Sequence, residues 1–503
     1  MASTFRGLLA MLGLSASLAG AASNHVPPNG LAALHVPPGF KVEKVAGAGL
    51  LSYPMMGTID ERGRLFLCES SGNSMSTEKM AAKPDYVIRM LEDTDGDGVY
   101  DRSTIFADKL TLPAGAVWYR GALYVAAPPD LIRLEDTDGD GIADRREVIV
   151  TGWNLSSNAA SLHGPFFGPD GWLYLTDGRH GYDIKTRDGR AFKGEASRIW
   201  RVHPDGTGLE WVAGGGFDNP VELIFLPTGE TIGTMTYFQD PRDGQRDALM
   251  HWEWGGVYPK WYSVVSEFKR TGDLMPVMTK FARIAPAGLV RYRSASFGPQ
   301  YQGNLFSAQF NPHRVQRHIL HRDGATFRTE DEDFLTSSDP DFHPTDVMED
   351  ADGSLLVVDT GAWFIDGCPL SRVAKPEIKG GIYRIRKVGS PTVGDPRGEK
   401  LKLDGMNPEN LVRYLDDSRP AVRDRVREFL VSAGEAAVDA LTHAVQHSPA
   451  SEARTAAVWA LFRIGTPRAE QGVRTALDDP NFRVRISAAS AAGMARDPRL
   501  WTD

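Results

Sequence analysis

Cysteine is scarce in this sequence, and the patterns of several common enzyme sites are missing. The 503 residues include two cysteines, Cys68 and Cys368, which can form a disulfide if the protein is exported; two buried free thiols are the alternative. No C-x-x-C-H pattern occurs, so no c-type haem is attached to this chain. The sequence also lacks a Walker loop, a G-x-G-x-x-G fingerprint, an H-E-x-x-H zinc motif and a G-x-S-x-G elbow. It therefore does not indicate a P-loop, NAD-type, zinc-peptidase or serine-hydrolase site.

Basic residues are also fewer than acidic ones. Lys and Arg together number 56 against 65 Asp and Glu, which gives a net charge of −9. Binding to a nucleic-acid backbone relies on a basic field that neutralises phosphates. We therefore expect no nucleic-acid partner.

Long apolar runs are absent except at the N-terminus. There, Arg6 precedes an apolar stretch over residues 7–18, and Ala19-Gly20-Ala21 forms an A-x-A cleavage site. The stretch is too short for an ordinary membrane span. This order predicts a secretory signal peptide over residues 1–21 and an exported protein, periplasmic or extracellular. An uncleaved membrane anchor is the alternative.

Glycine, in contrast, is abundant, with 52 residues, and it marks a repeat. Six short apolar strands, each opened by a glycine turn, begin at Gly63, Gly121, Gly171, Gly229, Gly303 and Gly353. Each is followed by a second strand that ends near an arginine, at 87–90, 131–134, 198–201, 288–291, 314–317 and 381–384. Short apolar strands between turn signals are typical of strands buried between neighbouring sheets. We therefore predict an all-β six-bladed β-propeller over residues 34–387, with a pair of sheets packed as a β-sandwich as the alternative.

Two segments stand outside this repeat. A strand-like stretch at 40–46 (FKVEKVA) precedes the first unit, and we predict that it completes the last blade and closes the ring. The long gap between Tyr237 and Ala287 is interpreted as an insertion, rich in Trp, His and Tyr at 251–262 (HWEWGGVYPKWY). Such a loop covers a pocket on the propeller face or is a packed excursion without a role.

The last part of the chain follows a different pattern. Residues 388–404 are rich in Pro, Gly and Lys, which predicts a linker. Residues 405–503 carry apolar residues at helical spacing, with a period of about 30 residues. This pattern predicts an α-helical HEAT-like solenoid, and we expect such an array to bind a protein partner.

The strongest local motif occurs twice and predicts calcium. Both copies, at 93–101 and 136–144, have the pattern D-x-D-G-D-G-x-x-D, in which carboxylates at alternate positions face inward on a tight loop. The second copy has Glu147 at the twelfth position, where a bidentate ligand sits, whereas the first has Thr104, so we expect weaker binding there. Both copies follow the same blade strand, which favours structural ions; an Asp/Gly-rich turn without an ion is the alternative. The predicted ligands are Asp93, Asp95, Asp97, Asp101, Asp136, Asp138, Asp140, Asp144 and Glu147.

Three further stretches contain candidate site residues. His163 shortly precedes the strand that begins at Gly171, so we predict that it lies just before an inner strand, at the axial mouth of the ring. An imidazole in that place acts as a general base near neutral pH. The run at 214–220 (GGGFDNP) also precedes an inner strand, and its glycines let the backbone approach a ligand. Arg372 and Lys375 meet an anionic ligand or are solvated surface charges.

With these motifs in place, residues 34–387 resemble the propeller of the soluble glucose/sorbosone dehydrogenases. The closest resemblance is to the planctomycete-type branch named for a membrane-bound dehydrogenase. It rests on V-P-P-G-F-K-V from Val36, the paired D-T-D-G-D-G loops, G-P-D-G-W-L-Y from Gly168 and G-I-Y-R-I from Gly381. Members of this branch often continue into HEAT repeats and then a c-type cytochrome.

The resemblance implies an enzyme that oxidises a carbohydrate-type hydroxyl with pyrroloquinoline quinone (PQQ). His163 matches the family's base, and Asn219 matches the Asn of its quinone-binding Gly-His-Arg-Asn-Pro-Gln-Gly motif. The Arg position of that motif holds Asp218, and a carboxylate is unfavourable beside an anionic tricarboxylate cofactor. Arg372 and Lys375 are the further candidates for binding the cofactor. Because this chain has no haem motif, the electrons would pass to a separate cytochrome or another acceptor.

Two other functions are compatible with the sequence. One is a non-catalytic propeller that binds carbohydrate or protein, with the helical array as a second binding surface; Asp218 and the missing haem favour it. The other is a calcium-dependent propeller hydrolase, such as a lactonase, which needs acidic and amide ligands that converge on the axis. Its candidate ligands are Asn158, Asp218, Asn219 and Glu222.

Overall fold

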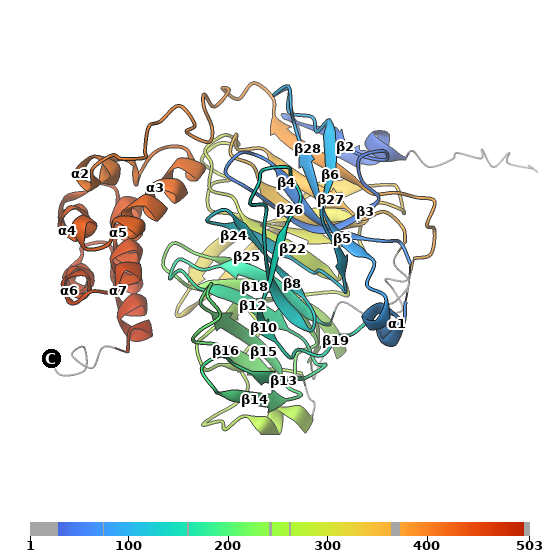
Figure 1. Cartoon of the computed structure of the whole chain (residues 1–503), viewed down its shortest axis with the longest axis horizontal. Coiled ribbons are helices and arrows are strands. Elements are labelled where there is room, and N and C mark those ends of the chain that lie inside the picture. Colours follow the sequence, from blue (N-terminus) through green and yellow to red (C-terminus); the bar gives the residue numbers. More distant parts are fainter. Residues whose placement is uncertain are drawn as a thin grey trace, which may run out of the picture.

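Six small antiparallel sheets, arranged as the blades of a ring, form most of the molecule (Figure 1). The computed structural model describes residues 29–73, 75–157, 160–240, 244–260, 263–363 and 373–496, so the predicted signal peptide lies outside the described residues. From the axis outward, the strands of blade 1 are β3 (Tyr53–Ile59), β4 (Leu65–Ser70), β5 (Tyr86–Glu92) and β6 (Arg102–Leu110); of blade 2, β7 (Ala116–Tyr119), β8 (Ala122–Ala127), β9 (Asp130–Glu135) and β10 (Arg145–Thr151); and of blade 3, β11 (Leu162–Phe167), β12 (Leu173–Asp177), β15 (Ser197–Val202) and β16 (Glu210–Gly215).

The other three blades follow the same order. The strands of blade 4 are β17 (Asn219–Phe225), β18 (Thr231–Asp240), β19 (Gly244–Trp252) and β21 (Thr279–Phe281); of blade 5, β22 (Pro286–Arg291), β23 (Leu305–Gln309), β24 (Arg314–Asp323) and β25 (Thr326–Ser337); and of blade 6, β26 (Pro344–Glu349), β27 (Leu355–Asp359), β28 (Gly381–Lys387) and β2 (Phe40–Ala46). The innermost strands contact one another around the ring, from β3 through β7, β11, β17, β22 and β26 back to β3. The six-bladed propeller is therefore confirmed, and the β-sandwich is not observed.

Several small elements surround the ring. They are η1 (Gly30–Ala33), β1 (Leu34–His35), α1 (Thr77–Ala82), the hairpin of β13 (Tyr182–Lys185) and β14 (Ala191–Gly194), β20 (Val257–Tyr258) and η2 (Ser263–Glu267). β1 extends blade 5 and β20 extends blade 3, so neither starts a sheet of its own.

The ring closes between the two ends of the propeller sequence. β2 pairs antiparallel with β28, so that Phe40 lies opposite Lys387. Phe40 also packs edge-on against Phe297, Tyr301 and Phe334 of blade 5. The predicted role of residues 40–46 in completing the last blade is thus confirmed.

The glycine-initiated strands predicted from the sequence are the second strands of the blades, not the innermost ones. Gly63 and Gly121 form the turns before β4 and β8, with φ angles of +89° and +79°. β4 and β8 are buried at every position, which explains the uninterrupted apolar runs that made these strands visible in the sequence. Several innermost strands were harder to recognise because they begin at or next to a proline and contain bulges, as between Pro220 and Leu223 of β17.

Blade 4 differs from the predicted unit. Residues 288–291, predicted as its second strand, lie in β22 and open blade 5. The third strand is β19, which ends at His251-Trp252 rather than near an arginine, so the repeat pattern missed it. β19 and β21 both lie in the stretch interpreted as an insertion, and β20 from the same stretch pairs in parallel with β16. Most of that stretch therefore belongs to the propeller.

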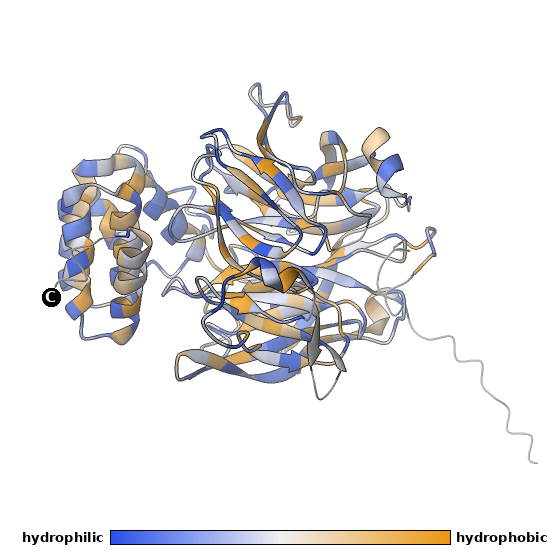
Figure 2. Ribbon diagram, turned by 90° about the horizontal axis from the view of Figure 1, so that it is seen from below, coloured by the Kyte–Doolittle hydropathy of each residue, from blue (hydrophilic) through white to orange (hydrophobic). Residues whose placement is uncertain are grey.

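The C-terminal part is helical. A short helix, α2 (Pro408–Leu411), is followed by five longer ones: α3 (Pro420–Ala433), α4 (Val438–His447), α5 (Ser451–Ile464), α6 (Pro467–Thr475) and α7 (Phe482–Met494). Figure 1 shows α3, α5 and α7 as an inner layer beside the propeller and α4 and α6 as an outer layer. The layers enclose a core of their own, and Figure 2 shows their apolar faces turned toward each other. No helix within the described part of the chain is both long and apolar enough to span a membrane.

The inner helical layer covers one end of the propeller. Trp459 of α5 is 2% exposed and donates its indole N–H to the carbonyl oxygen of Pro227, just after β17, at 2.9 Å. Its ring fills the space beside Gly229, where a Cβ atom would overlap it. Arg463 of the same helix donates to the hydroxyl of Tyr119 at the end of β7. We call this end, where the innermost strands finish, the lower mouth, and the opposite end, where they begin, the upper mouth.

Candidate active site at the upper mouth

His163 lies at the upper mouth, in the innermost strand of blade 3. It is the second residue of β11 and pairs with Thr176 of β12. Its side chain is nearly buried, with 4% exposed. The prediction that it precedes an inner strand is wrong in detail, because the strand that begins after Gly171 is the second strand of the blade. Its predicted place at the axial mouth is nevertheless where the structure puts it.

Asn219 begins β17 in the neighbouring blade. The hydroxyl of Thr176, opposite His163, donates to the carbonyl oxygen of Pro220 at 2.6 Å and so joins the two blades at this point. Oδ1 of Asn219 is buried and has no hydrogen-bond partner among the described residues. A buried acceptor without a donor is costly unless a ligand or water satisfies it. The structure thus brings His163 and Asn219 to adjoining strands and leaves one acceptor there for a ligand.

Asp218, which stands where the glucose/sorbosone dehydrogenase motif has an arginine, is held between two cations. Its carboxylate forms an ion pair with Arg179, from the loop after β12, and another with Nζ of Lys260 at 3.2 Å. Lys260 follows β20, whose parallel pairing with blade 3 carries it to this position. The three side chains together have one net positive charge when all are ionised. The bare negative charge expected from the sequence is therefore not what a ligand at the upper mouth would meet.

Burial changes the protonation of the groups around Asp218. It lowers the pKa of Lys260 to about 8, although the Asp218 carboxylate acts in the opposite direction. Burial, followed by the nearby Arg179 charge, also lowers the pKa of His180. The Lys260 side chain is only 4% exposed, so its ammonium is poorly solvated and gains from an anionic neighbour. The upper mouth between blades 3 and 4 is a mildly cationic, partly desolvated site.

Lys375 is placed elsewhere. It lies between β27 and β28 of blade 6, across the ring from blade 3, and its ammonium forms an ion pair with Asp341 at 2.6 Å. Arg372, Cys368 and Asn158 lie outside the described residues. Of the predicted cofactor-binding residues, the structure thus brings only Asn219 next to His163.

The two acidic loops connect the third and fourth strands of blades 1 and 2, on the side of the lower mouth. Ligand atoms of Asp93, Asp95 and Asp97 lie within 4.8 Å of one another. The same holds for the corresponding residues of the second loop, Asp136, Asp138 and Asp140. The remaining predicted ligands are engaged with protein groups: Asp101 with the Thr94 hydroxyl at 2.7 Å, Asp144 with the Thr137 hydroxyl at 2.6 Å, and Glu147 with Arg187 at 2.9 Å.

Both loops join their blade to the preceding one. In the first, the amide of Tyr100 donates to the carbonyl of Val45 in β2 at 2.9 Å. In the second, the amide of Ala143 donates to the carbonyl of Phe106 in β6 at 2.8 Å. Tyr100 and Ala143 occupy the same position in the two motifs. The loops therefore lie at blade seams, far from His163, as the prediction of structural rather than catalytic ions requires.

Two buried carboxyl groups lie along the axis between the two mouths. Burial raises the pKa of Asp346 in β26 to about 7, while the amides of Gly57 and Val347 donate to it at 2.9 and 2.7 Å. Burial and the neighbouring Asp346 raise the pKa of Glu222 in β17 well above its ordinary value. A Cβ atom on Gly288 of the intervening blade would overlap Asp346 Oδ1, so glycine is needed there. The middle of the axis thus favours protonated, neutral carboxyl groups.

Sequence reasoning missed Asp346, Arg179 and Lys260. A signal for Asp346 exists, because the segments Asn219-Pro-Val-Glu and His343-Pro-Thr-Asp both open innermost strands. Each places an acidic residue two positions after the proline. No comparable pattern links Arg179 or Lys260 to Asp218. Arg179 follows β12 and reaches Asp218 through the fold of blade 3, whereas Lys260 is brought there by the pairing of β20 with that blade.

Several solved structures share the propeller architecture. An oxidoreductase of the glucose dehydrogenase type from Thermus thermophilus is 20% identical, with 69% of this chain and 100% of that chain covered and a TM-score of 0.45. The holo form of the pyranose dehydrogenase PQQ domain from Coprinopsis cinerea is 14% identical, with coverages of 70% and 97% and a TM-score of 0.45. The calcium structure of a Trichoderma reesei enzyme of carbohydrate-active family AA12 is 13% identical, with coverages of 71% and 97% and a TM-score of 0.48.

These similarities are low and concern architecture only. No curated protein sequence matches the chain. A family model described as a domain of unknown function, DUF7133, matches residues 26–388, which include the whole ring and both acidic loops. The chain therefore belongs to the DUF7133 family.

Proposed function

We propose that the upper mouth between blades 3 and 4 oxidises a hydroxyl group of a sugar or another alcohol, with PQQ as the cofactor. The observation that carries this proposal is the position of His163 in the innermost strand, one blade from Asn219 and Asp218. The match of His163 and Asn219 to the glucose/sorbosone dehydrogenase motifs supports the same chemistry.

The residues at the upper mouth fit an anionic quinone better than the sequence alone suggests. PQQ carries three carboxylates, and Arg179 and Lys260 supply cations beside Asp218. The desolvated ammonium of Lys260 gains from an additional anion. Oδ1 of Asn219 needs a donor, and the ring N–H of the cofactor is a suitable one. When bound, the quinone would accept the hydride that leaves the substrate carbon.

The protein's own contribution is to move a proton and to orient the substrate. The imidazole of His163 takes the proton of the substrate hydroxyl while the adjacent C–H bond is lost, so that a carbonyl forms. The pairing of His163 with Thr176, and the hydrogen bond from Thr176 to Pro220, hold the backbone that carries His163 beside the start of β17. Such positioning lowers the barrier because no reorganisation is needed during the reaction.

A dye-linked oxidation assay tests this function. The parent protein, incubated with PQQ and calcium, should reduce the dye in the presence of at least one aldose or polyol. His163→Gln should lower the rate by about 100-fold or more, because general-base catalysis contributes 10²–10⁴-fold. His321→Gln, in the outer part of blade 5, should leave the rate unchanged. A parent that is inactive across a sugar panel, or a fully active His163→Gln, would refute the proposal.

The hydrolase alternative draws less support from the geometry. Two of its candidate ligands are unsuited to a cation, since Asp218 is already paired with Arg179 and Lys260, and burial favours the protonated form of Glu222. The non-catalytic binding module differs from the proposed enzyme only in lacking turnover. The dye-linked assay therefore distinguishes it as well.

Calcium binding, export, an electron acceptor and a protein partner are further parts of the proposal. We propose that both acidic loops bind calcium, that the protein is exported, and that a separate cytochrome or similar acceptor removes the electrons. We also propose that the C-terminal helices form a HEAT-like array for a protein partner. Since α3, α5 and α7 face the propeller, that partner would meet the outer layer, where Arg468 of α6 pairs with Glu435 and Asp439.

A further inference from the structure

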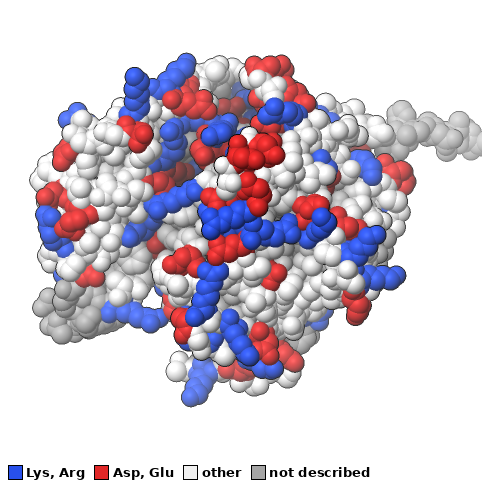
Figure 3. Space-filling view, in the orientation of Figure 1, with Lys and Arg blue, Asp and Glu red and all other residues white. Residues whose placement is uncertain are grey.

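A polar cleft separates the lower mouth from the helical layer. It consists of two adjoining cavities of about 480 and 470 Å³, within the size range of small-molecule sites. The first reaches from the axial carboxyl groups to α3 and α5, and the second continues between blade 5 and the start of α7. Figure 3 shows charged side chains of both signs gathered where the helices meet the propeller. Six residues line both cavities: Leu226, Pro227, Arg291, Gln302, Glu452 and Thr455.

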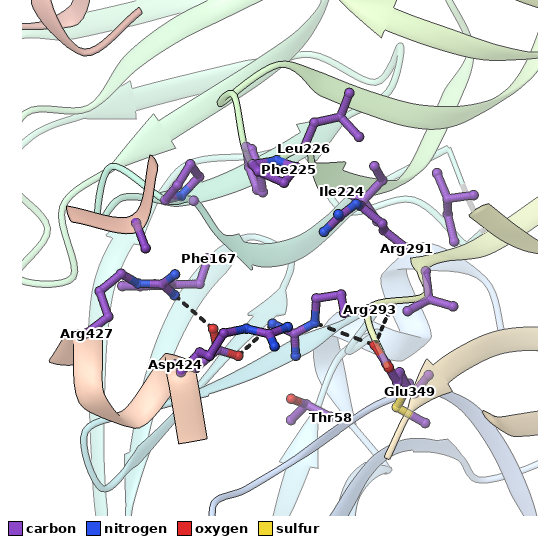
Figure 4. A pocket seen from close by; sticks show the side chains of 18 of the residues that line it. Thr58, Phe167, Ile224, Phe225, Leu226, Arg291, Arg293, Glu349, Asp424 and Arg427 are labelled. Atoms are coloured by element: carbon purple, nitrogen blue, oxygen red, sulfur yellow. Dashed lines mark hydrogen bonds and ion pairs between the residues drawn. The ribbon is translucent and has the colours of Figure 1, made fainter. Parts of the chain in front are cut away.

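Four charges on one side of this cleft satisfy one another. Asp424 of α3 forms ion pairs with Arg427 at 3.2 Å and with Arg293, after β22, at 2.7 Å. Arg293 in turn pairs with Glu349 at the end of β26 at 3.5 Å (Figure 4). This series of ion pairs attaches α3 to blades 5 and 6. It also removes these four groups from the set available to a ligand.

Three other charged side chains in the cleft lack such partners. Arg291, the last residue of β22, forms no side-chain hydrogen bond or ion pair with any described residue, and the same is true of Glu452 in α5. Arg423 of α3 donates to the carbonyl oxygen of Asp417 at 2.6 Å but has no carboxylate partner among the described residues. Burial lowers the pKa of Arg291 to about 10 and also lowers that of Arg423. Two cations and one carboxylate thus remain in the first cavity, with one net positive charge. Arg483, an exposed residue of α7, adds a further cation to the lining of the second cavity.

An unpaired guanidinium in an enclosed cleft is costly, and a planar oxyanion is its best partner. Arginine presents five N–H donors in a fork that matches a carboxylate in a bidentate manner. The nearby Glu452 repels a second negative charge, which disfavours inorganic phosphate or a dicarboxylate. The same carboxylate accepts hydrogen bonds from hydroxyl groups. The surplus of one positive charge favours a monoanion over a neutral sugar or a zwitterion.

We propose that this cleft binds a sugar acid, a small hydroxylated monocarboxylate, with its carboxylate on Arg291 and Arg423 and its hydroxyl groups toward Glu452. This site is separate from the upper mouth and does not depend on the function proposed there. It lies between two domains, so that a bound ligand contacts both the propeller and the helices.

Isothermal titration calorimetry on the full chain, without added quinone, tests the site with three probes. Sodium gluconate should bind at a single site. Glucose, which has the hydroxyl groups without the charge, and acetate, which has the charge without the hydroxyl groups, should each bind at least tenfold more weakly. Equal affinity for acetate or for glucose would overturn the proposal, and so would the absence of gluconate binding at millimolar concentrations.

Variants locate the site. Arg291→Gln should weaken gluconate binding by about tenfold or more, since a hydrogen bond to a charged group contributes about 1.5–3 kcal/mol. Glu452→Gln should weaken gluconate more than acetate. Arg328→Gln, an exposed arginine of β25 outside the cleft, serves as the matched control and should bind like the parent. If Arg291→Gln fails to fold, Arg291→Lys keeps the charge but loses the fork, and it should still bind several-fold more weakly. Binding that is unchanged in the folded Arg291 variant would place gluconate elsewhere and refute the site.

Discussion

The two mouths of the ring are built by the same six strands but present different chemistry. At the upper mouth, where the strands begin, His163, Asn219 and the Asp218 ion pairs lie on strand starts and loops of blades 3 and 4. At the lower mouth, where the strands end, a layer of helices covers the opening, and arginines and carboxylates line the cleft beneath it. In a propeller the loops at each end vary without disturbing the blades. One scaffold therefore offers two separate candidate sites, and a property of one mouth need not be shared by the other.

The largest expected effect concerns the helical cover of the lower mouth. Trp459→Ala removes the ring that packs beside Gly229 and its hydrogen bond to Pro227, so it should lower the free energy of unfolding by about 3–5 kcal/mol. Urea unfolding followed by circular dichroism measures this loss. Phe482→Ala is the control, because Phe482 is 48% exposed and its removal should cost less than about 0.5 kcal/mol. Equal losses in the two variants would mean that the helices only rest on the propeller.

The next effect concerns the buried carboxyl groups that separate the mouths. Asp346 has a folded-state pKa of about 7, raised above the ordinary value of 3.8 by burial. Below about pH 4 it is protonated in both states and contributes nothing. As the pH rises to 7 only the unfolded state ionises, so stability falls, and above pH 7 the full penalty persists. With about 1.36 kcal/mol for each pH unit, the penalty reaches at most about 4 kcal/mol.

Asp346→Asn removes this pH dependence. Between pH 4 and pH 8, the free energy of unfolding of the variant should rise relative to that of the parent by up to about 4 kcal/mol. The loss of one acceptor for the Gly57 or Val347 amide costs the same at both pH values, so it does not affect this change. Urea unfolding at both pH values measures the gain. Thr345→Ala, one residue earlier, involves no titratable group, and its free energy of unfolding should differ from that of the parent by the same amount at both pH values. A pH-independent effect of Asp346→Asn would mean that water reaches the axis and solvates the carboxylate.

The sequence predicts most of the ring, for a physical reason. Second strands such as β4 and β8 are buried on both faces, so their apolar runs and preceding glycine turns are visible without any tertiary information. The closing strand at 40–46 is visible for a different reason, because apolar residues are interspersed with charged ones in FKVEKVA, as in a half-buried strand. β19 was missed because it ends at His251-Trp252 rather than near an arginine and so departs from the repeat. The position of the helical layer was not predictable either, since it depends on shape, as in the fit of Trp459 beside Gly229.

The candidate site was predictable only where it follows local motifs. His163 and Asn219 follow from motifs next to strands, and both are at the upper mouth. Arg179 and Lys260 are far apart in the sequence: the first meets Asp218 through the fold of blade 3, the second through the addition of β20 to that blade. Charges that meet through tertiary pairing leave no spacing in the sequence. That is why the Asp218 carboxylate looked unfavourable for an anionic cofactor until its two cations were located.

The smallest expected effect compares the acidic loops, which lie at the seams on the lower side. Each cluster of three carboxylates repels itself without a cation, and each loop is joined to the neighbouring blade through Tyr100 or Ala143. An occupied site adds about 2.7 kcal/mol to the free energy of unfolding when free calcium is 100 times its dissociation constant, and the melting temperature should therefore be higher in calcium than in EGTA.

Asp95→Ala and Asp138→Ala should each lose part of this difference in melting temperature, whereas Asp323→Ala, at an exposed hairpin tip, should keep it. The larger loss is expected for Asp138→Ala, because the second loop has Glu147 at the twelfth position and is predicted to bind calcium more tightly than the first, which has Thr104 there. Coincident melting curves in calcium and EGTA would show that the loops are rigid turns that need no ion.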